Sequence, residues 1–386
     1  MHMTPETELL LLCARHHKSE SAFNRLVDLL NSHLDWDNIL QLAYQNNIIP
    51  LLAETFVGDL RSLVIKNVHD EIQDYYREAT RYSLQLAVEL LKVVDLFSDR
   101  HIDVVPFKGL VFSLLIYGDI AKRPGGDIDL LVRPELHKES EKLLSAVGYS
   151  VKMRDENAMQ SSLWHKGKDI YIDLHWGIPP RSSRIKSDLL WRNLEPVNCL
   201  GKPVKTFCPQ DALLITAVNA TKEYWMPSLH HFSDITALAA GYSNKDWGKV
   251  VRRATRLNCK RALYSALMLC NQLLAFEIPD LISKQIARED NLNLIVEEIK
   301  DHLFYDPSSY DRFEAKRTNR FIGTIDYQRT LLDSSFRRAT FHFWRRVAPN
   351  DLDYRIVSLP KALHFLYYFI KAGRVLIRSL KFGNRG

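Results

Sequence analysis

Residues 104–132 constrain the fold more than any other part of the chain. They read VVPFKGLVFSLLIYGDIAKRPGGDIDLLV, which predicts an apolar strand, a Lys-Gly turn, a helix, a Gly-Gly turn and a second strand that opens with Asp127 and Asp129. Side chains alternate between the faces of a strand, so these two carboxylates point the same way, about 7 Å apart. Carboxylates this close repel each other unless a cation lies between them, and a divalent ion with oxygen ligands is the usual candidate.

The flanking sequence indicates a mixed fold. Residues 5–100 are typical of helices, and residues 68–99 carry apolar side chains at helical spacing with neither Gly nor Pro, which predicts one long helix. Residues 35–56 indicate two short helices that divide at Pro50. From residue 102 strands and helices alternate, and beyond residue 180 only helices are expected. The predicted class is α+β, a small mixed sheet flanked by helices, with helical N-terminal and C-terminal regions.

Four parts are predicted: a helical N-terminal region (1–100), a core that carries the sheet (101–180), a helical bundle (181–330) and a basic, aromatic C-terminal helical region (331–386). The 386 residues are 46% hydrophobic and 25% charged, which is ordinary globular composition and does not favour disorder.

The cysteines and the N-terminus bear on where the protein resides. Five scattered cysteines without a C-x-x-C pair argue against a disulfide framework or a structural zinc site, and they favour a reducing compartment. No basic leader segment and no apolar run of membrane-spanning length is seen. The protein is therefore expected to be cytoplasmic.

The net charge of +6 is concentrated near the C-terminus, where residues 337–386 hold eleven Lys and Arg against two Asp. A helix there would carry four cations at three- or four-residue spacing: Lys371, Arg374, Arg378 and Lys381. One interpretation is contact with nucleic acid or an anionic membrane surface. The alternative is a helix packed on the bundle with a solvated basic face, which is favoured because aromatic residues surround this helix.

A third carboxylate, Asp173, lies in the predicted strand KDIYIDLHW, with His175 on the same face. Three carboxylates on adjacent strands suit metal-assisted phosphoryl or nucleotidyl transfer, in which divalent ions hold a triphosphate and activate a hydroxyl. Asp127 and Asp129 would bind the metal. Asp173 would complete the metal site and accept the proton of the attacking hydroxyl.

The Lys-Gly turn before the helix is the expected phosphate site. The backbone N–H of Gly109 and the helix N-terminus behind it would meet the phosphates. Lys108 either adds a positive charge there or is a solvated turn residue. His175 either acts directly in the site or packs at the edge of the sheet.

The sequence resembles the uncharacterised nucleotidyltransferase family of the DNA polymerase beta superfamily over about residues 40–280. The shared pattern is a Lys-Gly at the strand exit, an Arg before two alternating aspartates, a Gly-aromatic pair and a late Asp-Leu-His-Trp. Here it falls on Lys108 and Gly109, Arg123, Asp127 and Asp129, Gly148 and Tyr149, and residues 173–176. The resemblance implies a nucleotidyltransferase that uses Mg²⁺ (or Mn²⁺) and a nucleoside triphosphate, expected to be ATP.

The resemblance also implies further site residues. Arg123 either binds phosphate or pairs with Asp127 and holds the turn. Lys222 and Asp234, from the helical part, either reach the site or pair with neighbouring side chains, and pairing is favoured. The residues expected to bind the nucleotide are Lys108, Gly109, Arg123 and His175.

The expected function is transfer of a nucleoside monophosphate from the triphosphate to a hydroxyl or other nucleophile of an unidentified small-molecule or peptide acceptor. Two alternatives stay open. One is a toxin-like transferase that acts on tRNA or protein, which the basic C-terminus would suit. The other is a non-catalytic scaffold that binds nucleotide or a partner protein, against which the three carboxylates argue.

Overall fold

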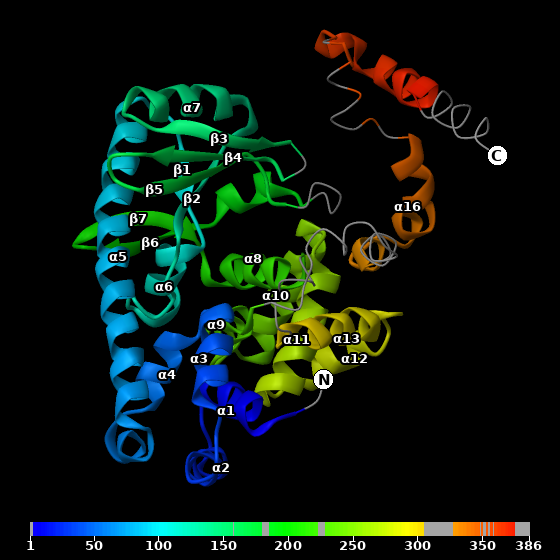
Figure 1. Ribbon diagram of the computed structural model, residues 1–386. Helices are drawn as coiled ribbons and strands as arrows, with labels where there is room; N and C mark the ends of the chain where they lie inside the picture. The colour runs from blue at the N-terminus through cyan, green and yellow to red at the C-terminus, as the bar shows by residue number, and fades with distance from the viewer. Residues whose placement is uncertain are drawn as a thin grey trace, which may run out of the picture. The chain divides into compact units, whose positions relative to one another are not determined.

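The computed structural model describes residues 3–156, 158–179, 185–222, 228–304, 327–347, 349, 353, 356–357 and 359–374 (Figure 1). The chain divides into two compact units, Met1–Leu331 and Leu332–Gly386. The four-part division of the chain stays a prediction.

The N-terminal part of the first unit is helical, as predicted. Its helices are α1 (Pro5–Cys13), α2 (Glu20–Leu30), α3 (Trp36–Gln45), α4 (Ile49–Thr55), the 3₁₀ segment η1 (Gly58–Leu63) and α5 (Lys66–Asp99). The long helix is confirmed as α5, which has 34 residues. The two short helices predicted within residues 35–56 are confirmed as α3 and α4, but the break lies before Pro50. Pro50 lies in the first turn of α4, where its missing N–H removes no helical hydrogen bond.

A five-stranded mixed sheet follows. Its strands are β1 (Val104–Pro106), β2 (Asp127–Val132), β3 (Ser150–Asp155), β4 (Gln160–His165) and β5 (Ile170–His175). The spatial order is β1-β2-β5-β4-β3, with β2 and β5 parallel and every other neighbouring pair antiparallel. Helix α6 (Gly109–Tyr117) joins β1 to β2, and η2 (Pro134–Leu136) with α7 (His137–Ala146) joins β2 to β3. The predicted α+β class is confirmed.

The two faces of the sheet differ in character. Ile128, Leu130 and Val132 of β2 are buried in the hydrophobic core that α5 and α7 form over one face (Figure 1). The alternating side chains of β2, which begin with Asp127 and Asp129, therefore lie on the opposite face. This opposite face is called the open face below.

Beyond residue 180 the expectation of helices alone was wrong. After η4 (Ser187–Arg192), the strands β6 (Leu194–Cys199) and β7 (Lys202–Phe207) form an antiparallel hairpin. Its two-residue turn has positive φ at both positions, 50° at Leu200 and 85° at Gly201. Such a turn is usually announced by Asn-Gly or Asp-Gly, so a leucine at the first position gave no hairpin signal.

The remaining elements that the structure describes in the first unit are helical, as predicted. They are α8 (Pro209–Lys222), α9 (Leu229–Ala239), α10 (Asn244–Leu257), α11 (Lys260–Leu274), α12 (Asp280–Ile286) and α13 (Leu292–Leu303). Helices α8 and α9 pack against α6, and α8 also packs against β7, so this bundle lies next to the segment that leads into the carboxylates.

The second unit contains α16 (Ser335–Val347) and η6 (Lys361–Leu366). Within it, Arg374 Nε donates to Asp353 Oδ1 at 2.7 Å, and Lys371 Nζ lies 3.9 Å from Asp353 Oδ2. Two of the four predicted surface cations are thus paired with a buried carboxylate, while Arg378 and Lys381 lie outside the described residues. Among the helices that the structure describes, none is long and apolar enough to cross a membrane.

All five cysteines are buried, which gives a direct test of the fold. Burial raises the pKa of the Cys13 thiol to about 12 and that of Cys208 to about 11, and only the thiolate reacts readily. We expect no fast-reacting thiol when the folded protein meets Ellman's reagent at pH 8, and five equivalents after unfolding in guanidinium. A thiol that reacts within seconds in the folded protein would contradict the core assignment.

Candidate active site

The turn between β1 and α6 has an unusual backbone. Lys108 has φ 60° and ψ −159°, and Gly109 has φ 40°. A side-chain-bearing residue in this region costs about 1–3 kcal/mol of strain, which the surrounding structure must offset. The side chain of Lys108, the N-cap residue of α6, makes no capping hydrogen bond. It therefore leaves uncapped the backbone N–H groups at this end of the helix, which attract anions.

The Gly-Gly turn lies directly against this first turn. A Cβ atom built on Gly125 would lie 3.3 Å from the Cα atom of Gly109 and 3.6 Å from the carbonyl oxygen of Asp127. The two backbones can approach this closely because neither carries a side chain. The Lys108–Gly109 turn is thereby held beside the start of β2.

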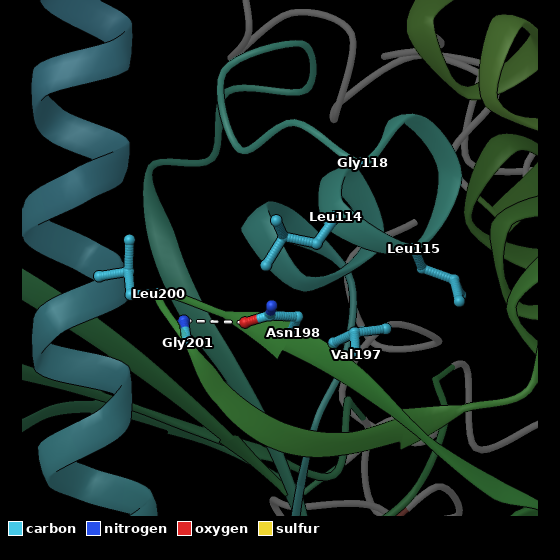
Figure 2. Close-up of a pocket in the computed structure, with 7 residues that line it drawn as sticks. All are labelled: Leu114, Leu115, Gly118, Val197, Asn198, Leu200 and Gly201. Carbon is cyan, nitrogen blue, oxygen red and sulfur yellow. Dashed lines mark hydrogen bonds between the residues drawn. The ribbon is translucent and has the colours of Figure 1, made fainter.

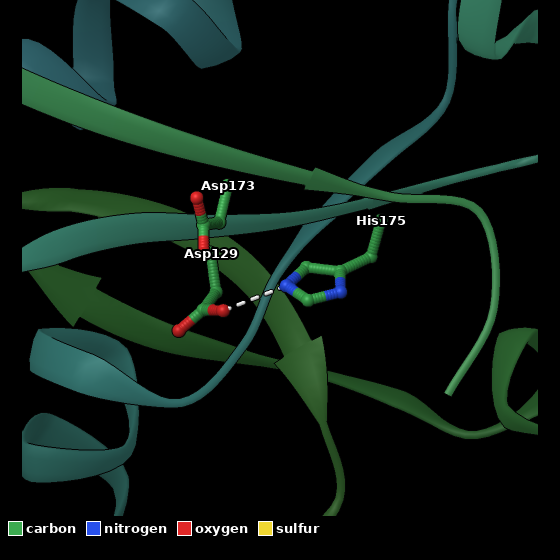
Figure 3. A group of neighbouring side chains, drawn as sticks. All are labelled: Asp129, Asp173 and His175. Carbon is green, nitrogen blue, oxygen red and sulfur yellow. Dashed lines mark hydrogen bonds and ion pairs between the residues drawn. The ribbon is translucent and has the colours of Figure 1, made fainter. Parts of the chain in front are cut away.

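The carboxylates predicted to act together come from adjacent strands. Asp129 of β2 is the register partner of Asp173 of β5, and Asp127 is the partner of Tyr171. The ligand atoms of Asp129, Asp173 and His175 all lie within 4.8 Å of one another (Figure 3). This group contains His175 instead of Asp127, which lies two residues before Asp129 on the same face.

Asp129 is held by two donors at one oxygen. Lys108 Nζ donates to Asp129 Oδ1 at 3.0 Å, and His175 Nε2 lies 2.8 Å from the same atom. Burial acts to raise the pKa of Asp129, but Lys108 and the hydrogen bond from His175 keep it below its ordinary value. Asp129 is therefore ionised at neutral pH. The interpretation of Lys108 as a solvated turn residue was wrong, because its side chain is only 13% exposed.

The other two carboxylates have the opposite tendency. Burial raises the pKa of Asp127, and the charges of Asp129 and Asp173 raise it further. Burial and the charge of Asp129 likewise raise the pKa of Asp173. Three carboxylates that oppose each other's ionisation create a negative potential that a divalent cation would relieve. Their oxygens are the donors that Mg²⁺ and Mn²⁺ prefer, so the residues fit such an ion.

His175 is neutral and forms a hydrogen bond with Asp129. Burial, followed by the charge of Lys108, lowers the pKa of His175 to about 4. A carboxylate can only accept, so Nε2 of the neutral ring carries the proton that Asp129 receives. Its Nδ1 atom is buried with no partner in the described part of the chain. Binding metal through Nε2 would break the bond to Asp129, so we assign His175 to orienting that carboxylate.

Arg123 joins the Lys108–Gly109 turn to the helical bundle. Its Nε donates to Asp234 Oδ2 at 2.6 Å, and its Nη1 donates to the carbonyl oxygen of Gly109 at 3.3 Å. Tyr117 also donates to Asp234, at 2.8 Å. The alternative that Arg123 pairs with Asp127 was therefore wrong. For Asp234, the favoured interpretation of a paired residue is confirmed, and the partner lies 111 positions away in the sequence.

Side chains from other elements also surround the carboxylates. Lys222, at the end of α8, lies close enough for its charge to lower the pKa of His175 and to oppose the rise at Asp173. Gln160 of β4 donates to Asp173 Oδ2. No sequence pattern singles out Gln160, because the register of β4 on β5 is what brings it there.

His231 of α9 is a second residue that was not singled out from the sequence. Burial lowers its pKa well below the ordinary value, with smaller contributions from His230, Arg123 and Lys222. Its Nδ1 atom has no hydrogen-bond partner within the described residues. The His-His pair shortly before Asp234 was the available signal.

Gly148 and Tyr149 turn out to support the sheet. Gly148 has φ 98°, and a Cβ atom there would lie 2.8 Å from Nε2 of His165, so a larger residue would be strained and crowded. Tyr149 donates its hydroxyl to Glu89 Oε1 of α5 at 2.8 Å. This pair of residues therefore fixes the start of β3 on α5.

A separate pocket of about 440 Å³ lies between the end of α6 and the β6–β7 hairpin (Figure 2). It is lined by Leu114, Leu115, Gly118, Val197, Asn198, Leu200 and Gly201. Asn198 accepts a hydrogen bond from the backbone of Gly201 at 2.8 Å. Since no titratable side chain lines the pocket, the chemistry is assigned to the carboxylates.

Two solved structures are similar to parts of this chain. The antibiotic-resistance factor ANT(2'')-Ia is 15% identical, with 47% of this chain and 94% of that chain covered and a TM-score of 0.32. An antigenic nucleotidyltransferase-like protein from Paracoccidioides brasiliensis is 18% identical, with 52% and 95% covered and a TM-score of 0.30. A search of curated protein sequences gave no significant match.

The family model described as "Uncharacterised nucleotidyltransferase" matches residues 32–275, well over half of the chain. This match includes the Lys108–Gly109 turn, all three carboxylates and the helices α8 and α9. The resemblance seen in the sequence is therefore confirmed, and the chain belongs to the uncharacterised nucleotidyltransferase family.

Proposed function

We propose that this protein transfers a nucleoside monophosphate from a nucleoside triphosphate to a nucleophile, expected to be a hydroxyl, on a small-molecule or peptide acceptor. The observation that carries the proposal is the pairing of Asp129 with Asp173 across parallel strands, with Asp127 on the same face beside the Lys108–Gly109 turn. Membership of the nucleotidyltransferase family supports it.

Asp127, Asp129 and Asp173 would hold Mg²⁺ or Mn²⁺. When bound, such an ion would neutralise charge on the phosphates and lower the pKa of the attacking hydroxyl. His175 keeps Asp129 oriented through its 2.8 Å hydrogen bond. Lys108 has a second task, because its ammonium group holds Asp129 and lies at the turn where phosphates would arrive.

The phosphates would meet the backbone N–H of Gly109 and the N-terminal end of α6, with ATP as the expected substrate. Arg123 keeps that turn in place through the Gly109 carbonyl and Asp234. In the transfer step, the acceptor oxygen forms a bond to the α-phosphorus while the bond from the α-phosphorus to the bridging oxygen breaks. Asp173 accepts the acceptor's proton, and pyrophosphate leaves with the bonding electrons.

The two alternatives receive less support from the described residues. A tRNA-directed transferase would use the basic C-terminal helix, yet Lys371 and Arg374 are paired with Asp353. A scaffold would not need three mutually repelling carboxylates beside a strained turn.

The test is a calorimetric titration of each nucleoside triphosphate with and without Mg²⁺. We expect the wild type to bind at least one of them only with Mg²⁺, and the Asp127→Ala/Asp129→Ala variant to lose this binding. The loss follows because the variant lacks two of the three carboxylates that would hold the ion.

The matched control is Asp95→Ala, because Asp95 is an exposed carboxylate of α5 that pairs with the exposed Lys202. It should bind as the wild type does. Circular dichroism should show that all variants are folded. If the wild type binds no triphosphate, or the double variant binds equally well, the scaffold alternative replaces the transferase.

A further inference from the structure

The open face of the sheet carries an aromatic stack next to the carboxylates. The register places Tyr171 of β5 opposite Asp127 of β2 on one side and opposite Trp164 of β4 on the other. Residues that are register partners share a face of the sheet. Asp127, Tyr171 and Trp164 therefore form one row on the open face, and Asp129, Asp173 and Ser162 form the next.

Several contacts hold the aromatic stack in place. The rings of Trp164 and Tyr171 are stacked with centroids 6.2 Å apart and planes at 30°. Lys152 Nζ lies 4.4 Å from the centroid of the Trp164 ring, and Trp164 Nε1 donates to Asp169 Oδ1 at 3.0 Å. These contacts fix Trp164, which in turn supports Tyr171 from the β4 side.

Tyr171 nevertheless stays open to solvent. Its relative exposure is 41%, although its strand neighbours Ile170 and Ile172 are buried in the core on the other face. A large aromatic ring that is held rigidly but left exposed loses little conformational entropy when a ligand stacks on it. The exposed part of Tyr171 lies outward and toward Asp127, since Trp164 contacts it from the opposite side.

The geometry of in-line displacement indicates which of the two substrates lies next to the Tyr171 ring. The Lys108–Gly109 turn lies on the β1 side of the carboxylates: a Cβ atom on Gly109 would lie 3.5 Å from the carbonyl oxygen of Asp127. In nucleotidyl transfer the attacking and leaving oxygens lie roughly opposite each other at the phosphorus. With the pyrophosphate held at the turn, the nucleophile arrives from the β5 and β4 side, where Asp173 and the aromatic stack lie.

We infer that Tyr171, backed by Trp164 and Lys152, is the acceptor subsite, and that the acceptor carries a ring, aromatic or glycosyl, whose face stacks on Tyr171. This inference rests on the proposed function and adds the class of acceptor to it. Neighbouring strands are about 4.8 Å apart, so a ring on Tyr171 lies within about one ring's length of the carboxylates. The accepting hydroxyl is thus a substituent of that ring or of the atom next to it.

The test measures binding rather than turnover. The probe is p-nitrophenyl β-D-glucoside, which contains an aryl and a glycosyl ring. Its binding is measured by saturation-transfer NMR in the presence of Mg²⁺ and the non-transferable analogue α,β-methylene-ATP. Removing an aromatic platform from a stacked ring weakens binding by about tenfold or more. We expect that loss for Tyr171→Leu, and a change within about twofold for Tyr171→Phe, which keeps the ring.

Two controls make the result specific. Phe23→Leu removes another exposed aromatic side chain, 42% exposed on α2, and should not change probe binding. Glycerol has no ring and should show no difference between wild type and Tyr171→Leu. The dissociation constant of the nucleotide analogue, measured separately, should stay the same in Tyr171→Leu.

Three outcomes would overturn the inference: no binding of the glucoside by the wild type, equal binding by Tyr171→Leu, or a loss of nucleotide binding in Tyr171→Leu, which would make the ring a nucleobase site. Failure of the proposed function is a different result. In that case the wild type would not bind the analogue with Mg²⁺ at all.

Discussion

Replacement of Arg123 by methionine should lower the free energy of unfolding by about 3–5 kcal/mol. The guanidinium and its partner Asp234 are both buried, with side chains 8% and 1% exposed, and the distance between them is 2.6 Å. Burial raises the pKa of Asp234 even though Arg123 and Tyr117 act to lower it. Removing Arg123 would leave a buried carboxylate without its countercharge, which is among the most destabilising single changes. Chemical denaturation followed by circular dichroism measures the effect.

The comparison that isolates burial is Arg25→Met. Arg25 forms a similarly short ion pair with Glu8, at 2.7 Å, but the two side chains are 49% and 30% exposed. An exposed pair contributes less than about 1 kcal/mol. The double variant Arg123→Met/Asp234→Leu should regain at least about 1 kcal/mol over Arg123→Met, since it removes both charges. Equal effects of Arg123→Met and Arg25→Met would show that the buried pair is not formed as described.

Asp129→Asn should weaken binding of Mn²⁺ in the presence of ATP by at least about 100-fold. Changes to residues that only support a metal ligand cost about 10–100-fold, and Asp129 would be a ligand itself. The amide also removes the charge that both Lys108 and His175 contact. Electron paramagnetic resonance of free Mn²⁺ measures the affinity directly and needs no knowledge of the acceptor.

Asp95→Asn is the reference for that experiment because it makes the same chemical change at an exposed carboxylate, 60% exposed, and it should leave Mn²⁺ affinity unchanged. His175→Ala should fall between the two variants, since His175 orients Asp129 without binding the ion. An Asp129→Asn variant that holds Mn²⁺ as tightly as the wild type would remove Asp129 from the metal site.

The sequence was a good guide where local periodicity determines the outcome. The alternation of β2 placed Asp127 and Asp129 on one face, and the Gly- and Pro-free stretch before β1 formed a single helix. The pairing of Asp173 with Asp129 followed from putting two predicted strands next to each other. These features depend on neighbours within a few residues or on one strand contact.

The sequence was a poor guide where distant segments meet. Asp234 pairs with Arg123 and Gln160 contacts Asp173 only because of the way helices and strands are packed. The neutral state of His175 follows from burial, which periodicity alone does not measure. The hairpin β6–β7 was missed for a different reason, since Leu200 takes a positive φ that its residue type does not announce.

Helix α5 has a consequence for how the first unit holds together. Its early residues Val68 and Ile72 belong to the core of the helical part, while Leu90 and Phe97 belong to the core beneath the sheet. At 34 residues it is about 51 Å long, so one rigid rod is shared by two hydrophobic interiors. A fragment that lacks residues 1–100 would lose α5 from the face of the sheet that α5 and α7 cover. The N-terminal helices thus help to stabilise the sheet through α5. Destabilising them would also disturb the positions of the carboxylates on that sheet.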